Sequence, residues 1–178
     1  MPVEGATYTI GAVVTPVFTC ADVGSGVASC IPSSAKLDTS TPGTKTFSVT
    51  VVDRVGNRAT VIRTYNVGYG ICLKYNPNQP NQVLGVVIVA VQLCNASGAN
   101  LSSPSIQLLA TSIDGTITPP PNHYDPALAH PDFKYFLGTY YYHMFTSELS
   151  GVGVGAGLHS LGFSVNGVGG YSAGFTLR

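Results

Sequence analysis

The sequence predicts an all-β protein built from two small sandwich domains in tandem. Short runs of β-branched and aromatic residues recur along the chain, and turn-forming residues separate them, as in a β-sandwich. Twenty-one glycines and 12 prolines among the 178 residues supply these interruptions. No segment shows the apolar period of an amphipathic helix.

Residues 1–67 carry the clearest strand pattern. Residues 44–52 alternate polar and apolar side chains, as expected for a strand with one buried face. A turn then leads into residues 60–67, which are rich in β-branched and aromatic types. Residues 7–10 and 13–20 are also expected to be strands. We therefore predict a small sandwich over this first part of the chain.

Residues 68–70 form the expected short linker, and residues 71–178 form the second predicted domain. A Gly/Ser-rich loop is predicted at residues 22–29 and a Pro-rich loop at residues 117–131. Asn166-Gly167 is a strong signal for a tight hairpin. The strands expected in the second domain are residues 71–75, 83–94, 105–111, 158–165 and 171–177, with further strand structure in the aromatic-rich residues 133–145.

Charge is scarce in this chain. Charged residues make up 9% of the sequence and the net charge is zero, against about 25% charged residues in a typical domain. The few cations do not supply the basic face that nucleic-acid binding needs, and no apolar run is long enough to cross a membrane. We expect no nucleic-acid partner and no membrane insertion, whereas neutrality favours association between copies.

Four cysteines fall into two local groups, Cys20 with Cys30 and Cys72 with Cys94. Four cysteines allow three connectivities, and local pairing is favoured because each pair lies within one predicted domain. Zinc is the alternative, but these spacings lack the paired motif of a structural zinc site. Disulfides persist in oxidising compartments, so we expect an extracellular or cell-surface protein.

Catalytic and metal motifs are weak. A histidine and aspartate group could be drawn in the Pro-rich loop, from His123, Asp125, His130 and Asp132, but its spacing matches no strong metal motif. Turn acids Asp22, Asp38 and Asp53 could contribute to a calcium site, although no calcium-loop pattern is present. We predict no metal, no cofactor and no enzyme activity.

Two segments are candidates for a contact face. The strand at residues 83–91 is apolar at both parities, so its outer face needs a cover from its own chain or from a partner. The run Tyr140-Tyr141-Tyr142 must likewise place some rings outward, because alternate residues of a strand face opposite sides. The candidate contact residues are Val86, Ile88, Ala90, Tyr140 and Tyr142.

The sequence also resembles two known families. Four blocks resemble, in order, bacterial immunoglobulin-like repeats over about residues 2–67: residues 5–8, 18–30, 37–44 and 51–57. The second domain resembles the PxKF-type carboxyl-terminal module of secreted bacterial proteins over residues 92–106, 133–135 and 163–167, with Tyr171 and Phe175. It departs from that family at the Pro-x-Lys-Phe stretch itself, where residues 86–91 stand instead.

These resemblances imply an immunoglobulin-like first domain and a non-catalytic module. We therefore expect an extracellular structural module that associates with copies of itself in a surface stalk, fibre or filament. The alternative is a carbohydrate-binding or adhesive accessory module of a larger secreted enzyme or surface protein, with polysaccharide as its ligand and the tyrosines as its platform.

Overall fold

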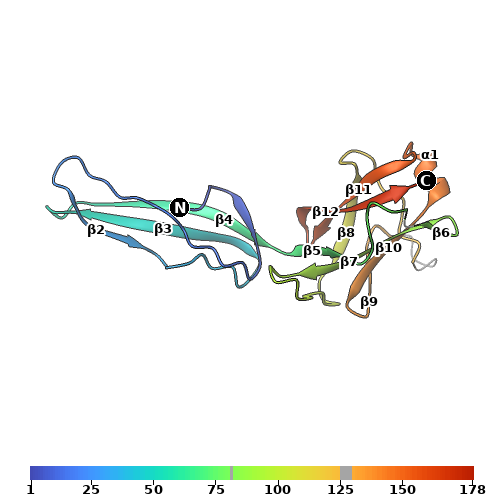
Figure 1. The fold of residues 1–178 in the computed structure, drawn as a ribbon, viewed down its shortest axis with the longest axis horizontal. Coiled ribbons are helices and arrows are strands. Elements are labelled where there is room, and N and C mark those ends of the chain that lie inside the picture. The colour runs from blue at the N-terminus through green and yellow to red at the C-terminus, as the bar shows by residue number, and fades with distance from the viewer. Residues whose placement is uncertain (81, 125–129) are drawn as a thin grey trace. The chain divides into compact units, whose positions relative to one another are not determined.

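A computed structural model describes residues 1–80, 82–124 and 130–178, and it confirms the all-β prediction (Figure 1). The chain divides into two compact units. Unit 1 comprises Met1–Gly70 together with Asn95–Ala99, and unit 2 comprises Ile71–Cys94 together with Asn100–Arg178. The loop at 95–99 thus groups with the first unit although both of its flanking segments belong to the second.

Unit 1 contains one four-stranded sheet. Its strands are β1 (Ala6–Thr9), β2 (Val27–Pro32), β3 (Gly43–Asp53) and β4 (Arg58–Gly68). Their order in the sheet is β1-β4-β3-β2, in which β1 runs parallel to β4 and the other neighbours are antiparallel. The predicted turn after residue 52 joins β3 to β4.

The core of unit 1 follows from the alternation seen in the sequence. Phe47 and Val49 of β3 and Tyr65 and Val67 of β4 are buried on one face of the sheet, two residues apart in each strand. Leu37 completes the buried cluster. Burial of these apolar side chains is the main favourable term in folding.

The prediction of a strand at residues 13–20 is wrong, because these residues form no strand. Val14 and Phe18 pack on the core with their side chains. Two main-chain hydrogen bonds of this segment stand out in the described part of the chain: the Leu37 N–H donates to the Val14 carbonyl, at 3.0 Å, and the terminal ammonium of Met1 donates to the Val17 carbonyl. Pro16 has no N–H to contribute to a ladder.

The loop predicted at residues 22–29 is also shorter than expected. The carboxylate of Asp22 accepts hydrogen bonds from the N–H groups of Gly24 and Gly26, which closes a tight loop. Strand β2 then begins at Val27 and pairs with the end of β3. Pairing with β3, which is distant in the sequence, thus makes the last residues of the predicted loop part of β2.

Unit 2 contains two sheets and a short helix. The first sheet has the order β5-β7-β10-β9, with β6 paired to β7, and the second has the order β12-β11-β8. The elements are β5 (Gly70–Leu73), β6 (Gln82–Val83), β7 (Val86–Cys94), β8 (Leu108–Ile113), β9 (Lys134–Phe136), β10 (Thr139–Phe145), α1 (Thr146–Gly151), β11 (Gly157–Val165) and β12 (Val168–Leu177).

Aromatic rings join the two sheets of unit 2. Phe133 lies with its ring centre 5.0 Å from that of Tyr142 on β10 and 5.2 Å from that of Phe163 on β11. The side chains of Val87, Val89 and other alternate residues of β7 are fully buried in the same core. The second unit is therefore a sandwich, with the apolar strand β7 at its centre.

Tight two-residue turns connect several strands of unit 2. The hairpin predicted at Asn166-Gly167 is present, and both residues have positive φ angles, of 48° and 79°. Leu84-Gly85 and Leu137-Gly138 adopt the same conformation, although leucine disfavours it. Both leucine side chains are exposed at the tips of their hairpins.

Candidate contact face

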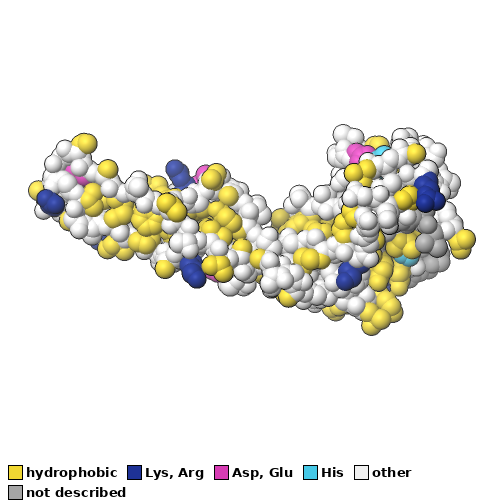
Figure 2. Space-filling model, in the orientation of Figure 1, with side chains coloured by type: hydrophobic (Ala, Val, Ile, Leu, Met, Phe, Trp, Pro, Cys, Tyr) yellow, Lys and Arg dark blue, Asp and Glu magenta, His cyan; other side chains and the backbone are white. Residues whose placement is uncertain are grey.

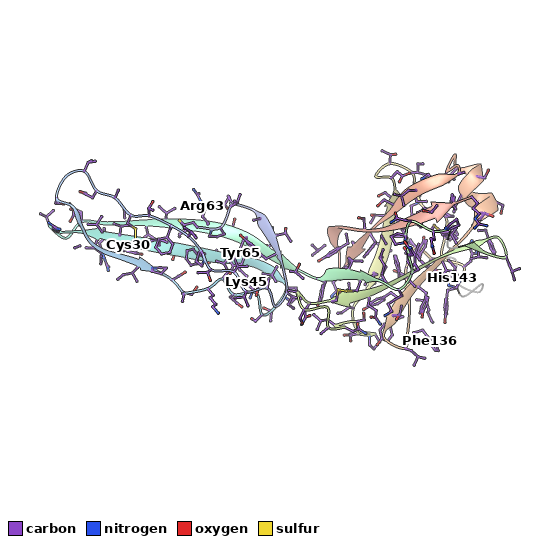
Figure 3. The ribbon with its side chains drawn as sticks, viewed as in Figure 1. Cys30, Lys45, Arg63, Tyr65, Phe136 and His143 are labelled. Carbon is purple, nitrogen blue, oxygen red and sulfur yellow. A yellow bond between two sulfur atoms is a disulfide. The ribbon has the colours of Figure 1, made fainter. Side chains whose placement is uncertain are left out.

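One face of the sheet in unit 2 that contains β7, β9 and β10 is turned away from the core. Register places the side chains of Val86, Ile88, Lys134, Phe136, Tyr141, His143 and Phe145 on this side, and we call this set the outer aromatic face. His143 lies opposite Ile88 and Phe145 opposite Val86. Figure 3 labels Phe136 and His143 on this sheet.

The structure does not place Tyr140 and Tyr142, two of the contact residues predicted from the sequence, on the outer aromatic face. Tyr140 and Tyr142 are 1% and 0% exposed and belong to the core. Their hydroxyls donate to the carbonyls of Ser103 and Pro120, at 2.8 and 2.6 Å. Burial raises the pKa of Tyr142. Tyr141, between them, is the tyrosine of the run that faces outward.

Val86, Ile88 and Ala90 all lie on the outer side of β7, because they pair with Phe145, His143 and Tyr141. Val86 and Ile88 are half-buried there, whereas Ala90 is covered and only 8% exposed. The sequence could not choose the parity of the tyrosines, because all three positions carry the same residue. Pairing with β7 decides it: Tyr140 lies opposite the buried Val91, and opposite residues of an antiparallel pair share a face. A contact role for the outer aromatic face stays a prediction, with Phe136 of β9 and Tyr141 and Phe145 of β10 among its aromatic members.

Asn122, a buried side chain, fixes the Pro-rich loop beside β10. Its side-chain oxygen accepts hydrogen bonds from the N–H groups of His143 and Tyr124, and its nitrogen donates to the carbonyls of Tyr141 and Asp132. These four bonds, of 2.8 to 3.0 Å, satisfy the whole amide. The loop therefore continues the edge of the sheet next to the outer aromatic face.

This loop adds two rings to the outer aromatic face. The ring centre of Tyr124 lies 5.0 Å from that of His143 and 5.7 Å from that of Tyr141. The ring of His123 lies 4.4 Å from that of Phe145, and its Nε2 lies 2.9 Å from a carboxylate oxygen of Glu148 on α1. Burial lowers the pKa of His143, so the neutral ring is the dominant form at neutral pH.

The outer aromatic face carries little charge. Strands β7, β9 and β10 contain one cation, Lys134, and no carboxylate. Phe136 and Phe145 are 50% and 40% exposed. In Figure 2, hydrophobic side chains gather over β9 and β10. Single exposed apolar residues are ordinary, but two phenylalanines on one nearly chargeless sheet face are typical of a contact surface.

The acids considered as metal ligands have other roles. Asp53 accepts hydrogen bonds within its own turn, as Asp22 does. Asp38 lies 2.6 Å from the ammonium of Lys45, and hydrogen bonds from Lys45 and Ser40 hold its pKa well below the usual range. Asp125 lies outside the described residues. Within residues 1–80, 82–124 and 130–178, no three His, Cys, Asp or Glu side chains come together as a metal site.

Both cysteine pairs form as the local-pairing hypothesis expects. Cys20 is bonded to Cys30 in unit 1, and Cys72 is bonded to Cys94 in unit 2. The second bond joins β5 to the end of β7, the strand at the centre of the sandwich. Two disulfides are usual for a protein of an oxidising compartment. The one helix in the described part of the chain is too short to cross a membrane.

Comparisons with known proteins identify no family for this chain. No family model matches the chain, and no curated protein matches it. A β-glucuronidase of Parabacteroides merdae in its glycerol-bound structure is 12% identical over 77% of this chain, with a TM-score of 0.37, and the match spans only 16% of that enzyme. Fibronectin(III)-like modules of Clostridium thermocellum CbhA are 11% identical, cover 98% of this chain and 88% of theirs, and have a TM-score of 0.29. Structural similarity with such low TM-scores and identities says nothing about the activity or partners of this chain. The fold described above therefore rests on the strands and sheets of this chain alone.

Proposed function

We propose that this chain is a non-catalytic, disulfide-bonded structural module of a larger extracellular or cell-surface protein. In this proposal, the outer aromatic face packs against another copy and builds a stalk, fibre or filament. The observation that carries the proposal is the exposure of two rings, Phe136 beside the start of β10 and Phe145 at its end, on a sheet face whose strands contain one cation and no carboxylate.

Physical arguments favour a protein partner for this face. Interface centres are depleted of charged residues and enriched in aromatic ones. Phenylalanine has no polar group with which to recognise a hydroxylated ligand, so its exposed area is best used against another apolar surface. The zero net charge of the whole chain also leaves only weak repulsion between copies.

The test is the oligomeric state of the purified chain. We expect sedimentation velocity and light scattering to show assembly that increases with protein concentration. The double variant Phe136→Ser, Phe145→Ser should shift the chain toward monomer, because it removes both exposed rings. Leu158→Ser is the matched control, since Leu158 is 63% exposed on the other sheet of unit 2. A chain that remains monomeric at millimolar concentration would overturn the self-association.

A second candidate function is polysaccharide binding. It is favoured by the packing of Tyr124 on Tyr141 and His143, which assembles aromatic rings with hydroxyl and imidazole groups at one place. Such rings offer both apolar area and hydrogen-bonding groups to a sugar. Retention on insoluble cellulose, chitin or peptidoglycan, reduced by Tyr141→Ala, would support this function. Passage of the wild-type chain through all three without delay would remove it.

A further inference from the structure

Part of strand β4 in unit 1 forms an open sheet edge. Strand β1 pairs with β4 only over Tyr65–Gly68. Residues 58–63 pair with β3 on one side, and within the described part of the chain they have no partner strand on the other. All six residues are exposed, including Val61 at 47% and Ile62 at 59%.

The hydrogen bonds of Thr64 show which backbone N–H and carbonyl groups of β4 point toward the open edge. Its N–H donates to the carboxylate of Glu4, 3.2 Å from each oxygen, and its carbonyl accepts the N–H of Gly5, at 3.0 Å. Both residues lie on the β1 side, so the backbone groups of Thr64 point to this edge. Because these groups alternate along a strand, those of Ile62 and Thr60 point the same way. They form a template for another strand.

The opposite edge of the same sheet, strand β2, is less suited to accept another strand. Strand β2 has an irregular register between Val27 and Ser29 and ends at Pro32, which has no N–H. Bulges and prolines are common devices against strand addition. The register of β4 against β3 is continuous from Val67 to Arg58, and this part of β4 contains no proline.

Charge indicates the kind of segment that would fit. Arg58 and Arg63 stand at the two ends of the open edge, and both are exposed. The nearest carboxylate oxygen of Glu4 lies 3.9 Å from the guanidinium of Arg63, but Glu4 stands beside Thr64, outside residues 58–63. The carboxylate of Asp53 accepts hydrogen bonds within its own turn. Two copies of β4 side by side would bring arginines together, which disfavours pairing with a second copy.

We propose that the open edge of β4 accepts, by β-strand addition, an extended segment of another protein with carboxylate side chains near its two ends. Backbone hydrogen bonds at Thr60 and Ile62 would supply affinity, and the carboxylates opposite Arg58 and Arg63 would supply selectivity. This proposal concerns unit 1 and does not depend on the outer aromatic face of unit 2.

The probe is an end-blocked peptide, Glu-Thr-Val-Thr-Val-Glu, compared with Lys-Thr-Val-Thr-Val-Lys, each added to the full chain. We expect the acidic peptide to bind about tenfold more tightly than the basic one, since reversal of two cross-strand charge pairs is worth that much. Amide hydrogen exchange should slow at Thr60 and Ile62 when the acidic peptide is bound. Arg58→Glu with Arg63→Glu should reverse the preference between the two peptides.

Two variants of one residue separate strand addition from simple charge attraction. Ile62→Pro removes the outward N–H and should abolish binding, whereas Ile62→Thr retains this N–H and should bind as the wild type does. If Ile62→Pro does not fold, the exchange protection at Thr60 and Ile62 in the wild type decides the question. Absence of acidic-peptide binding, or protection elsewhere only, would overturn the proposal. Protection of the same amides in a peptide-free dimer would also overturn it, because the occupant would then be a second copy.

Discussion

The side-chain oxygen of Asn122 accepts a hydrogen bond from the backbone N–H of His143, with 2.9 Å between the two heavy atoms. Asn122 follows a run of three prolines, and His143 lies in the middle of β10. The bond replaces the strand that would otherwise pair with this part of β10. It therefore connects the Pro-rich loop, including Tyr124, to the outer aromatic face.

We predict that Asn122→Ala destabilises the chain by about 2 kcal/mol, because the buried N–H and carbonyl groups that Asn122 satisfies lose their partner. Chemical denaturation should show this loss. Asn78→Ala is the control, since Asn78 is exposed in another loop of unit 2 and should change stability little. Equal stability of the two variants would show that water replaces the amide at no cost.

The two disulfides should differ in their contribution. Loss of the Cys72–Cys94 bond through Cys72→Ser with Cys94→Ser should cost about 3 kcal/mol, and loss of Cys20–Cys30 should cost roughly 0.7 kcal/mol less. The reason is that the sequence separations are 22 and 10 residues, so the longer loop restricts the unfolded chain more. Hydrogen exchange read by mass spectrometry reports each unit separately. A larger loss for the shorter loop would contradict this loop-length argument.

Leu137→Asn should stabilise unit 2 by about 0.5–1 kcal/mol, because asparagine tolerates the left-handed conformation better than leucine. Leu137 has a φ of 44° and is exposed, so the change removes no core contact. The thermal unfolding midpoint measures the effect. Leu158→Asn, at an exposed strand position, should bring no such gain, and a rise of equal size there would show that replacing an exposed leucine by asparagine stabilises the chain whatever its backbone conformation.

Acid should weaken unit 2 through Asp114. Burial raises the pKa of this carboxyl, but hydrogen bonds from the ring of His159 and the N–H of Ser160 lower it more, so the net pKa lies below the ordinary value of 3.8. A carboxyl with a lowered folded-state pKa contributes stability above its unfolded pKa and loses it as the pH falls through the folded one. Stability should therefore fall below about pH 4.

Asp114→Asn tests this dependence, because asparagine retains the local conformation and has no charge to lose. Unit 2 of the variant should show a smaller drop in unfolding midpoint between pH 5 and pH 2.5 than unit 2 of the wild type. Asp38 belongs to unit 1, so Asp38→Asn should leave the acid response of unit 2 unchanged. The same drop in Asp114→Asn and wild type would assign the acid sensitivity of unit 2 to other groups.

Local patterns in the sequence were sufficient for much of the fold. The alternation at residues 44–52 and the Asn166-Gly167 turn predicted β3 and the last hairpin, because period and turn chemistry act over a few neighbouring residues. The same reasoning failed at residues 13–20. Their side chains do pack on a core, but ladder formation depends on a backbone partner that the local sequence does not specify.

The contact face shows the same division. Composition determined that this chain has little charge, and the order of residues determined that the strand at residues 86–91 and the tyrosine run carry apolar or aromatic side chains on both faces. Only the tertiary structure decided that Tyr140 and Tyr142 turn inward while Tyr141 turns outward, and that β1 leaves residues 58–63 open. The physical reason is that strand register and sheet neighbours depend on pairing between segments far apart in the sequence, and this pairing leaves no recognisable pattern in the local sequence of either strand.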